Sequence, residues 1–275
     1  MFEIFQYSFI LRGLEAGIIV AFIAPLIGIF LVLRRYSLIA DTLAHVSLAG
    51  IALAFLFGWN PIVTTLGVTT ISSVGIEKLR NTKKIYGESA LALFLSGGLA
   101  LATVLLSLGK GFNSNLLNYL FGSIVTVTQN DIYTILILAI FVVSLLIMFY
   151  KELVYITFDE ESAKVSGLPV NFINTLFIIL VAITISLAIP IIGLLLITAL
   201  MVIPVVTVLQ LRLSFIKTIV YSEIISILSV VSGIFVSYYL NLSTGGTIVL
   251  MMLFVFIVVL FFKNFTWHKK EIIKK

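Results

Sequence analysis

Long apolar stretches alternate with short polar segments along almost the whole chain. Nine stretches are long enough, or nearly so, to cross the hydrocarbon layer of a membrane as a helix, which takes about 20 residues. The connection around Pro190 is so short that two neighbours could be one broken helix, and the pattern therefore predicts eight or nine spans. The stretches cover residues 13–33, 38–57, 61–76, 89–108, 131–150, 172–189, 191–211, 218–240 and 246–262.

The composition points to the same class of protein. Apolar residues make up 61% of the chain and charged residues 11%, and the mean hydropathy is +1.25. Soluble domains are roughly half apolar and a quarter charged. We therefore expect one all-α transmembrane domain over residues 1–275. The first apolar run follows no basic segment and is too long for the core of a signal peptide, so we expect it to remain in the protein.

The basic residues predict the orientation of this domain. Lys and Arg in short loops favour the cytoplasmic side of a membrane. Alternation of nine spans puts 15 of the 17 basic residues on the side of Arg34 and Arg35, and leaves Arg12 and Lys110 on the other. This bias predicts an outside N-terminus and an inside C-terminus. The net charge of +5 is therefore interpreted as a topology signal, and no nucleic-acid partner is expected.

Two segments are predicted to be something other than spans. Residues 113–124 are too short to cross and are bounded by polar residues, which is typical of an interfacial or re-entrant helix or of a plain loop. In the longest inside connection, Asp159 to Glu161 precede the apolar positions Ala163 and Val165, and Gly167 follows. Acidic residues at the start and glycine after the end predict a short surface helix within about 157–168.

Asp41 and His45 are the first candidates for chemistry, because they lie inside the apolar stretch 38–57. A carboxylate and an imidazole are costly in lipid and normally face a protein interior or a polar pathway. A spacing of four places both side chains on one helix face, where an oxygen and a nitrogen donor suit a divalent transition metal. A buried hydrogen-bonded pair that only holds helices together is the alternative.

Other polar residues in or near the spans are weaker candidates. Glu15 and Glu223 could line a pathway, but both lie near enough to a membrane interface to be hydrated. Glu88 and Asp131 are expected at helix N-termini, where the helix dipole favours negative charge. The chain has no cysteine, so a metal site must use nitrogen and oxygen donors.

Several segments resemble the permease subunits of zinc and manganese ABC importers. The signature of that family is similar to residues 33–50, and its cytoplasmic coupling loop is similar to residues 157–169. The resemblance continues in order from about residue 10 to residue 262. Further matches are Asn118-Tyr-Leu-Phe-Gly-Ser-Ile124, the run from Gly193 to Pro204, and the run from Ser237 to Gly245.

This resemblance implies the membrane half of a type II ABC importer in a bacterial plasma membrane. Its expected partners are a second copy of the chain, two cytoplasmic ATPase subunits and an extracellular metal-binding lipoprotein. Asp41 and His45 match the family's metal-coordinating pair, and no permanently bound cofactor is implied. Contacts with the ATPase are expected along the coupling segment. Its candidate residues are Phe158, Asp159, Ala163 and Gly167.

Three functions must be distinguished. An ABC permease needs an ATPase partner, and no phosphate-binding G-x-x-x-x-G-K-[ST] loop occurs here, so ATP would be hydrolysed on another chain. A secondary cation transporter would work without such a partner. An intramembrane metalloprotease is disfavoured by the lack of an H-E-x-x-H motif. Within the favoured class, the histidine favours zinc, and manganese remains the alternative.

Overall fold

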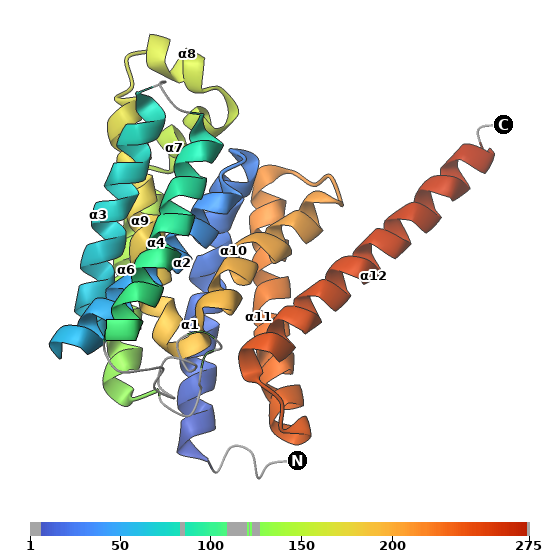
Figure 1. The fold of residues 1–275 in the computed structure, drawn as a ribbon. Coiled ribbons are helices and arrows are strands. Elements are labelled where there is room, and N and C mark those ends of the chain that lie inside the picture. Colours follow the sequence, from blue (N-terminus) through green and yellow to red (C-terminus); the bar gives the residue numbers. More distant parts are fainter. Residues whose placement is uncertain (1–6, 83–85, 109–119, 121, 123–126, 274–275) are drawn as a thin grey trace.

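The described part of the chain is a bundle of α-helices, and no strand occurs in it (Figure 1). This computed structural model describes residues 7–82, 86–108, 120, 122 and 127–273. The segment 113–124, predicted as a re-entrant helix or a loop, lies almost wholly outside the described residues. The helices are α1 (Ser8–Leu33), α2 (Ser37–Phe57), α3 (Pro61–Asn81), α4 (Gly87–Leu108), α6 (Gln129–Met148), α7 (Tyr150–Phe158), α8 (Glu160–Val165), α9 (Val170–Ile192), α10 (Leu194–Leu209), α11 (Phe215–Leu240) and α12 (Thr244–Ile273).

Each of the nine predicted spans corresponds to one of these helices. Seven of the described helices are long and apolar enough to cross a membrane. The other two are α3, which carries more polar residues, and α10, which has 16 residues. The break between α9 and α10 falls at Gly193 and not at Pro190. Gly193 has φ +80°, a left-handed conformation that only glycine adopts without strain.

The centre of the bundle consists of α1, α2, α9 and α10. These helices are apolar around most of their circumference and largely buried, whereas α4, α6 and α12 present large apolar side chains outward. Outward apolar residues are expected where the surrounding solvent is lipid. On the outer face of α4 these are Leu93, Leu99, Leu101 and Val104.

The helices α1 and α10 approach very closely. A Cβ atom added to Gly28 would lie 1.8 Å from the backbone oxygen of Met201. Small residues at such crossings let two backbones meet, which is how helices gain packing energy in lipid. This contact brings the first and second halves of the chain together at the α1–α10 crossing.

One end of the bundle carries α8, together with the ends of α1 and α3 and the starts of α4, α9 and α11 (Figure 1). We call it the α8 end. The chain's N-terminal helix starts at the opposite end (Figure 1). Most of the described basic residues are at or near the α8 end. They are Arg34, Arg35, Lys78, Arg80, Lys151, Lys164, Arg212, Lys217 and Lys263.

Candidate functional site

Helix α2 follows α1 after a very tight turn. Arg34 ends α1, and Arg35 has φ +60°, which reverses the chain direction within three residues. The backbone N–H of Tyr36 donates to the carbonyl oxygen of Leu31 at 2.7 Å and closes the turn. Helix α2 then runs from Ser37 and packs against α3 and α4, with further contacts to α9 and α10.

The Asp41–His45 pair lies on the face of α2 that these neighbours leave open. From residue 39 to residue 52, all residues of α2 except Asp41 and His45 are buried. The Asp41 and His45 side chains are 42% and 24% exposed. The two polar side chains are thus the exposed ones in this part of α2. A surface that faced lipid would instead carry apolar side chains here. Ionisable side chains within a membrane normally face a protein interior or a water-filled cavity.

The imidazole of His45 is oriented by its own helix. Its Nδ1 lies 2.9 Å from the backbone oxygen of Asp41 and 3.5 Å from Asp41 Oδ1. With the proton on Nδ1, this nitrogen donates to the carbonyl oxygen, and the lone pair of the ring is on Nε2. A hydrogen bond from one ring nitrogen to a backbone carbonyl is the usual support of a metal-ligating histidine. Nε2 has no hydrogen-bond partner among the described residues, so its lone pair is free to bind a metal ion.

The pair does not form a complete metal site within one protomer. Among the described residues, no three or more His, Asp or Glu side chains are arranged so that they could hold a metal ion together. A carboxylate and one imidazole supply too few donors for a four-coordinate transition metal. Further donors must come from water, from substrate or from a second chain.

The two other acidic candidates have different environments. Glu15 on α1 is exposed, as expected for a side chain near an interface. Glu223 on α11 is only 8% exposed, and neither carboxylate oxygen has a hydrogen-bond partner within the described residues. The expectation that Glu223 is hydrated at an interface is not met, because α11 packs against α1, α10 and α12.

Glu88 and Asp131 stand where they were expected. Glu88 lies in the first turn of α4. Asp131 forms a capping box with Thr128 at the start of α6: the Asp131 carboxylate accepts from the Thr128 backbone, and the Thr128 hydroxyl accepts from Asp131 N–H. Both are therefore explained by helix stability.

The predicted surface helix exists but is shorter than expected. It is α8, Glu160–Val165, whereas Phe158 belongs to the preceding helix α7 and Gly167 to the following turn. Asp159 caps α8 by accepting hydrogen bonds from the backbone and hydroxyl of Ser162 at 2.9 and 2.5 Å. These bonds hold the pKa of the Asp159 carboxyl below its ordinary value. Gly167 has φ +86°, which ends the helix in the conformation that glycine favours.

The four candidate coupling residues have different exposures. Ala163 is fully buried in the hydrophobic core, whereas Phe158 is 64% exposed. Next to them, Val165 is 90% exposed. Exposed apolar side chains are expected on lipid-facing helices, but α8 lies at the end of the bundle among charged residues. Val165 and Phe158 therefore mark a surface that could receive a partner.

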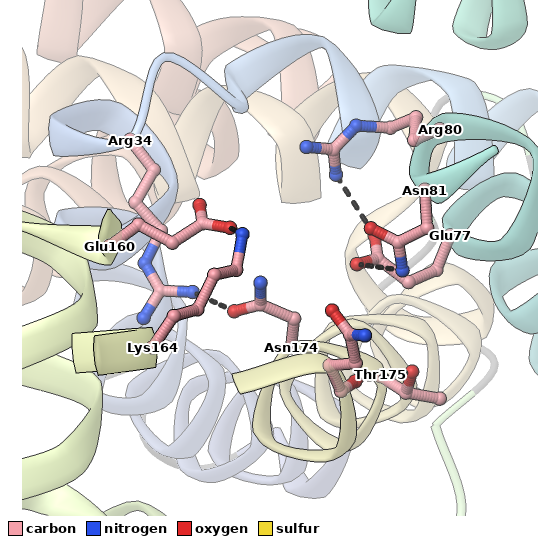
Figure 2. A network of polar contacts seen from close by, with 9 residues as sticks. Arg34, Glu77, Arg80, Asn81, Glu160, Lys164, Asn174 and Thr175 are labelled. Carbon is pink, nitrogen blue, oxygen red and sulfur yellow. Dashed lines mark hydrogen bonds and ion pairs between the residues drawn. The ribbon is translucent and has the colours of Figure 1, made fainter. Parts of the chain in front are cut away.

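A half-buried arginine, Arg34, connects this region to the start of α2. The Arg34 guanidinium donates through Nε to Thr157 Oγ1 at 2.8 Å, through Nη1 to Asn174 Oδ1 at 2.9 Å, and through Nη2 to the Leu153 carbonyl at 3.0 Å. Figure 2 shows Arg34 directed at Asn174, beside Glu160 and Lys164 of α8. Nothing in the sequence distinguishes Arg34 from Arg35, and the isolated Asn174 in an apolar span is the one local signal for this contact.

Comparison with known proteins identifies the family. The model of the ABC 3 transport family matches residues 6–263. The chain belongs to the ABC 3 transport family. Among its relatives in this family, a probable metal transport system membrane protein of Treponema pallidum is 38% identical over 255 residues, which are 93% of this chain and 96% of the relative.

Two other relatives of this chain carry the names of different metals. The manganese transport system membrane protein MntC of Listeria monocytogenes is 29% identical and covers 94% of this chain and 91% of its own. The high-affinity zinc uptake system membrane protein ZnuB of Haemophilus influenzae is 30% identical, with 93% and 98% covered. Family membership therefore does not choose between the two metals.

A solved structure has the same architecture. The fold is similar to that of a chain in the structure of PsaBC from Streptococcus pneumoniae in complex with a Fab, with a TM-score of 0.83 and 28% identity. That match covers 93% of this chain and 92% of the other. The fold is also similar, at a TM-score of 0.65 and 17% identity, to an inward-facing putative metal-chelate type ABC transporter.

Proposed function

We propose that this protein is the membrane permease of an ATP-driven importer of divalent metal ions, and that the preferred ion is zinc. The observation that carries the proposal is the Asp41–His45 pair, which is the part of mid-helix α2 that is open to the outside of the protomer. In a family whose relatives are named for metal transport, this pair is the natural binding site for the ion. The chain is a multi-pass protein of the bacterial cell membrane.

The ion would be held between two copies of the chain. A pair of donors from each copy supplies two carboxylates and two imidazoles, which is a full set for a four-coordinate ion. His45 lies about 12 Å along the helix from Ser37, near the middle of a membrane of usual thickness. A site at that depth can open to either side through modest rocking of the two subunits.

The energy would come from a separate ATPase chain that docks on α8. Val165 and Phe158 offer exposed apolar contacts at the α8 end, and the acidic and basic side chains around them suit a polar rim. The α8 end also carries most of the described basic residues, which favours its placement in the cytoplasm. An extracellular lipoprotein would deliver the ion at the opposite end.

Zinc is proposed as the ion because the site combines imidazole nitrogen with carboxylate oxygen. Nitrogen donors favour zinc over manganese, which prefers oxygen ligands. The relatives named for manganese transport make manganese the second candidate. The ion passes through, so the site must not close around it as tightly as a structural zinc site does.

The decisive experiment reconstitutes the purified chain with its co-purifying ATPase in liposomes. We expect uptake of radioactive zinc that requires ATP on the side of the liposome membrane where the ATPase lies. We expect unlabelled zinc to compete with this uptake better than manganese does. Better competition by manganese would reassign the ion within the same mechanism. Uptake that follows an ion gradient in the absence of any ATPase would contradict the proposal and indicate a secondary transporter.

A further inference from the structure

Arg34 is a half-buried cation whose hydrogen-bond partners are all neutral. Its three hydrogen bonds go to a hydroxyl, an amide oxygen and a backbone carbonyl, and it forms no ion pair within the described residues. Its guanidinium also lies 5.1 Å from the centre of the Phe177 ring. Burial lowers the pKa of Arg34 to about 10, so the side chain stays charged at physiological pH. A charge taken out of water without a carboxylate is costly, and an apolar side chain would pack here at lower cost.

The acceptors of Arg34 belong to the elements that carry α8. Leu153 and Thr157 lie on α7, which runs directly into α8. Asn174 is 4% exposed and lies on α9, which begins just after α8. The rigid fork of a guanidinium fixes all three acceptors relative to one another. Arg34 therefore attaches the end of α1 to both ends of the α7–α8–α9 connection.

The turn after Arg34 is held from its other side as well. The Arg80 guanidinium of α3 lies 3.9 Å from the centre of the Tyr36 ring and bonds Glu77 Oε2 at 3.0 Å. Figure 2 shows this second cluster, with Asn81 also bonded to Glu77, facing the cluster around Arg34. The turn between α1 and α2 is thus clamped between α3 and the α7–α8–α9 connection.

We propose that Arg34 is the positioning residue that makes the start of α2 move together with α8. The inference rests on the proposed function, in which α8 receives the ATPase and α2 carries the metal ligands. A displacement of α8 reaches Arg34 through α7 and then passes to Ser37, three residues further on. Because the first turns of α2 are helical and Ile39 and Ala40 are fully buried, the displacement continues to Asp41 as a rigid movement.

The test compares four variants in the reconstituted complex with its ATPase. Arg34→Gln removes the charge and most of the fork, and Arg34→Lys keeps the charge but not the geometry. Thr157→Val removes one acceptor and leaves Arg34 in place. The matched control is Arg35→Gln, because Arg35 is the exposed neighbour of Arg34. The backbone of residue 35 has φ +60°, and Gln, like Arg, places a side chain on it. Each complex is measured for ATPase association, equilibrium zinc binding, ATP hydrolysis and zinc uptake.

The informative quantity is the number of zinc ions imported per ATP hydrolysed. We expect this ratio to fall at least about fivefold in Arg34→Gln, less in Arg34→Lys and Thr157→Val, and not in Arg35→Gln. ATPase association and zinc binding should stay near wild type. A merely structural role would lower assembly, hydrolysis and uptake together and leave the ratio unchanged.

An unchanged ratio in Arg34→Gln would overturn the proposal. If Arg34→Gln does not assemble, Thr157→Val decides, and an unchanged ratio in that variant would overturn it equally. Failure of the proposed function is a different result, because the wild-type complex itself would then import no metal with ATP.

Discussion

At the scale of single residues, the environment of a side chain decides its chemistry more than its type does. Arg34 and Arg35 are adjacent and identical, yet Arg34 is bonded to two other helices and Arg35 is exposed. The exposure of Asp41 and His45 is decided in the same way, because α3 and α4 cover much of the rest of α2 and leave this pair open. Neighbouring helices thus determine which polar residues can act.

The first prediction concerns the metal ligands. Asp41→Ala or His45→Ala should weaken zinc binding by at least about tenfold, because each removes one donor of the proposed site. Isothermal titration of the purified protein with zinc measures the change. Glu88→Ala, which removes an exposed carboxylate from the first turn of α4, is the control.

Both ligand variants should still insert and assemble, because neither side chain is buried in the protomer. Wild-type zinc affinity in both variants would remove the pair from the site and leave the structural hydrogen bond as its role.

At the scale of elements, α8 has one buried side and one open side. Ala163 anchors the helix in the core, whereas Val165 points away from it. Ala163 was expected from the sequence to contact the ATPase, but a charge placed there would have to be buried and would disturb folding as well as docking. Val165 is therefore the better position for testing the contact with the ATPase.

The second prediction is that Val165→Glu weakens co-purification of the ATPase and lowers ATP hydrolysis by the complex. A charge replaces an apolar contact at the centre of the proposed docking surface. Val165→Ala should have a smaller effect, and zinc binding should persist in both variants. Loss of zinc binding with intact ATPase association would contradict the separation of the two sites.

The third prediction concerns the crossing of α1 and α10. Gly28→Ala should destabilise the protein by about 1–3 kcal/mol, because the added methyl group overlaps the Met201 backbone and the helices must separate. Thermal unfolding in detergent measures the change as a lower midpoint. The control is Gly97→Ala on α4, where an added Cβ meets no atom within 4 Å. Equal midpoints for the two variants would disprove the close approach.

At the scale of the whole molecule, a single copy supplies only two of the donors that the proposed metal site needs. The open face of α2 carries Leu38, which is 54% exposed, three residues before Asp41. An exposed face that mixes an apolar residue with a carboxylate and an imidazole suits neither lipid nor water alone. A second copy placed against it would cover Leu38 and bring the two donor pairs together.

The fourth prediction tests this arrangement. The natural chain has no cysteine, so Leu38→Cys introduces a unique thiol on the α2 face. A short bis-maleimide should cross-link two copies of Leu38→Cys into a species of twice the chain mass. Ile137→Cys, on the outward face of α6, should cross-link much less. Zinc should bind at one ion per two chains, and one ion per chain without cross-linking would refute a site shared by two copies.

The sequence by itself determined the class of the protein, its spans and the short helix α8, and it singled out Asp41 and His45 as the candidate metal ligands. Hydrophobic length, helical spacing and capping residues are local properties, and lipid forces each apolar stretch to satisfy its backbone within its own helix. Glycine at position 167 and the acidic start at Asp159 to Glu161 were enough to predict α8 within a few residues.

Only the tertiary structure decided which faces are covered. It buried Ala163 and Glu223, exposed Val165, moved the helix break to Gly193, and joined Arg34 to Thr157 and Asn174 across more than a hundred residues of sequence. Almost every position in these helices is apolar, so periodicity does not distinguish a lipid-facing side from a protein-facing one. Packing between helices supplies that distinction.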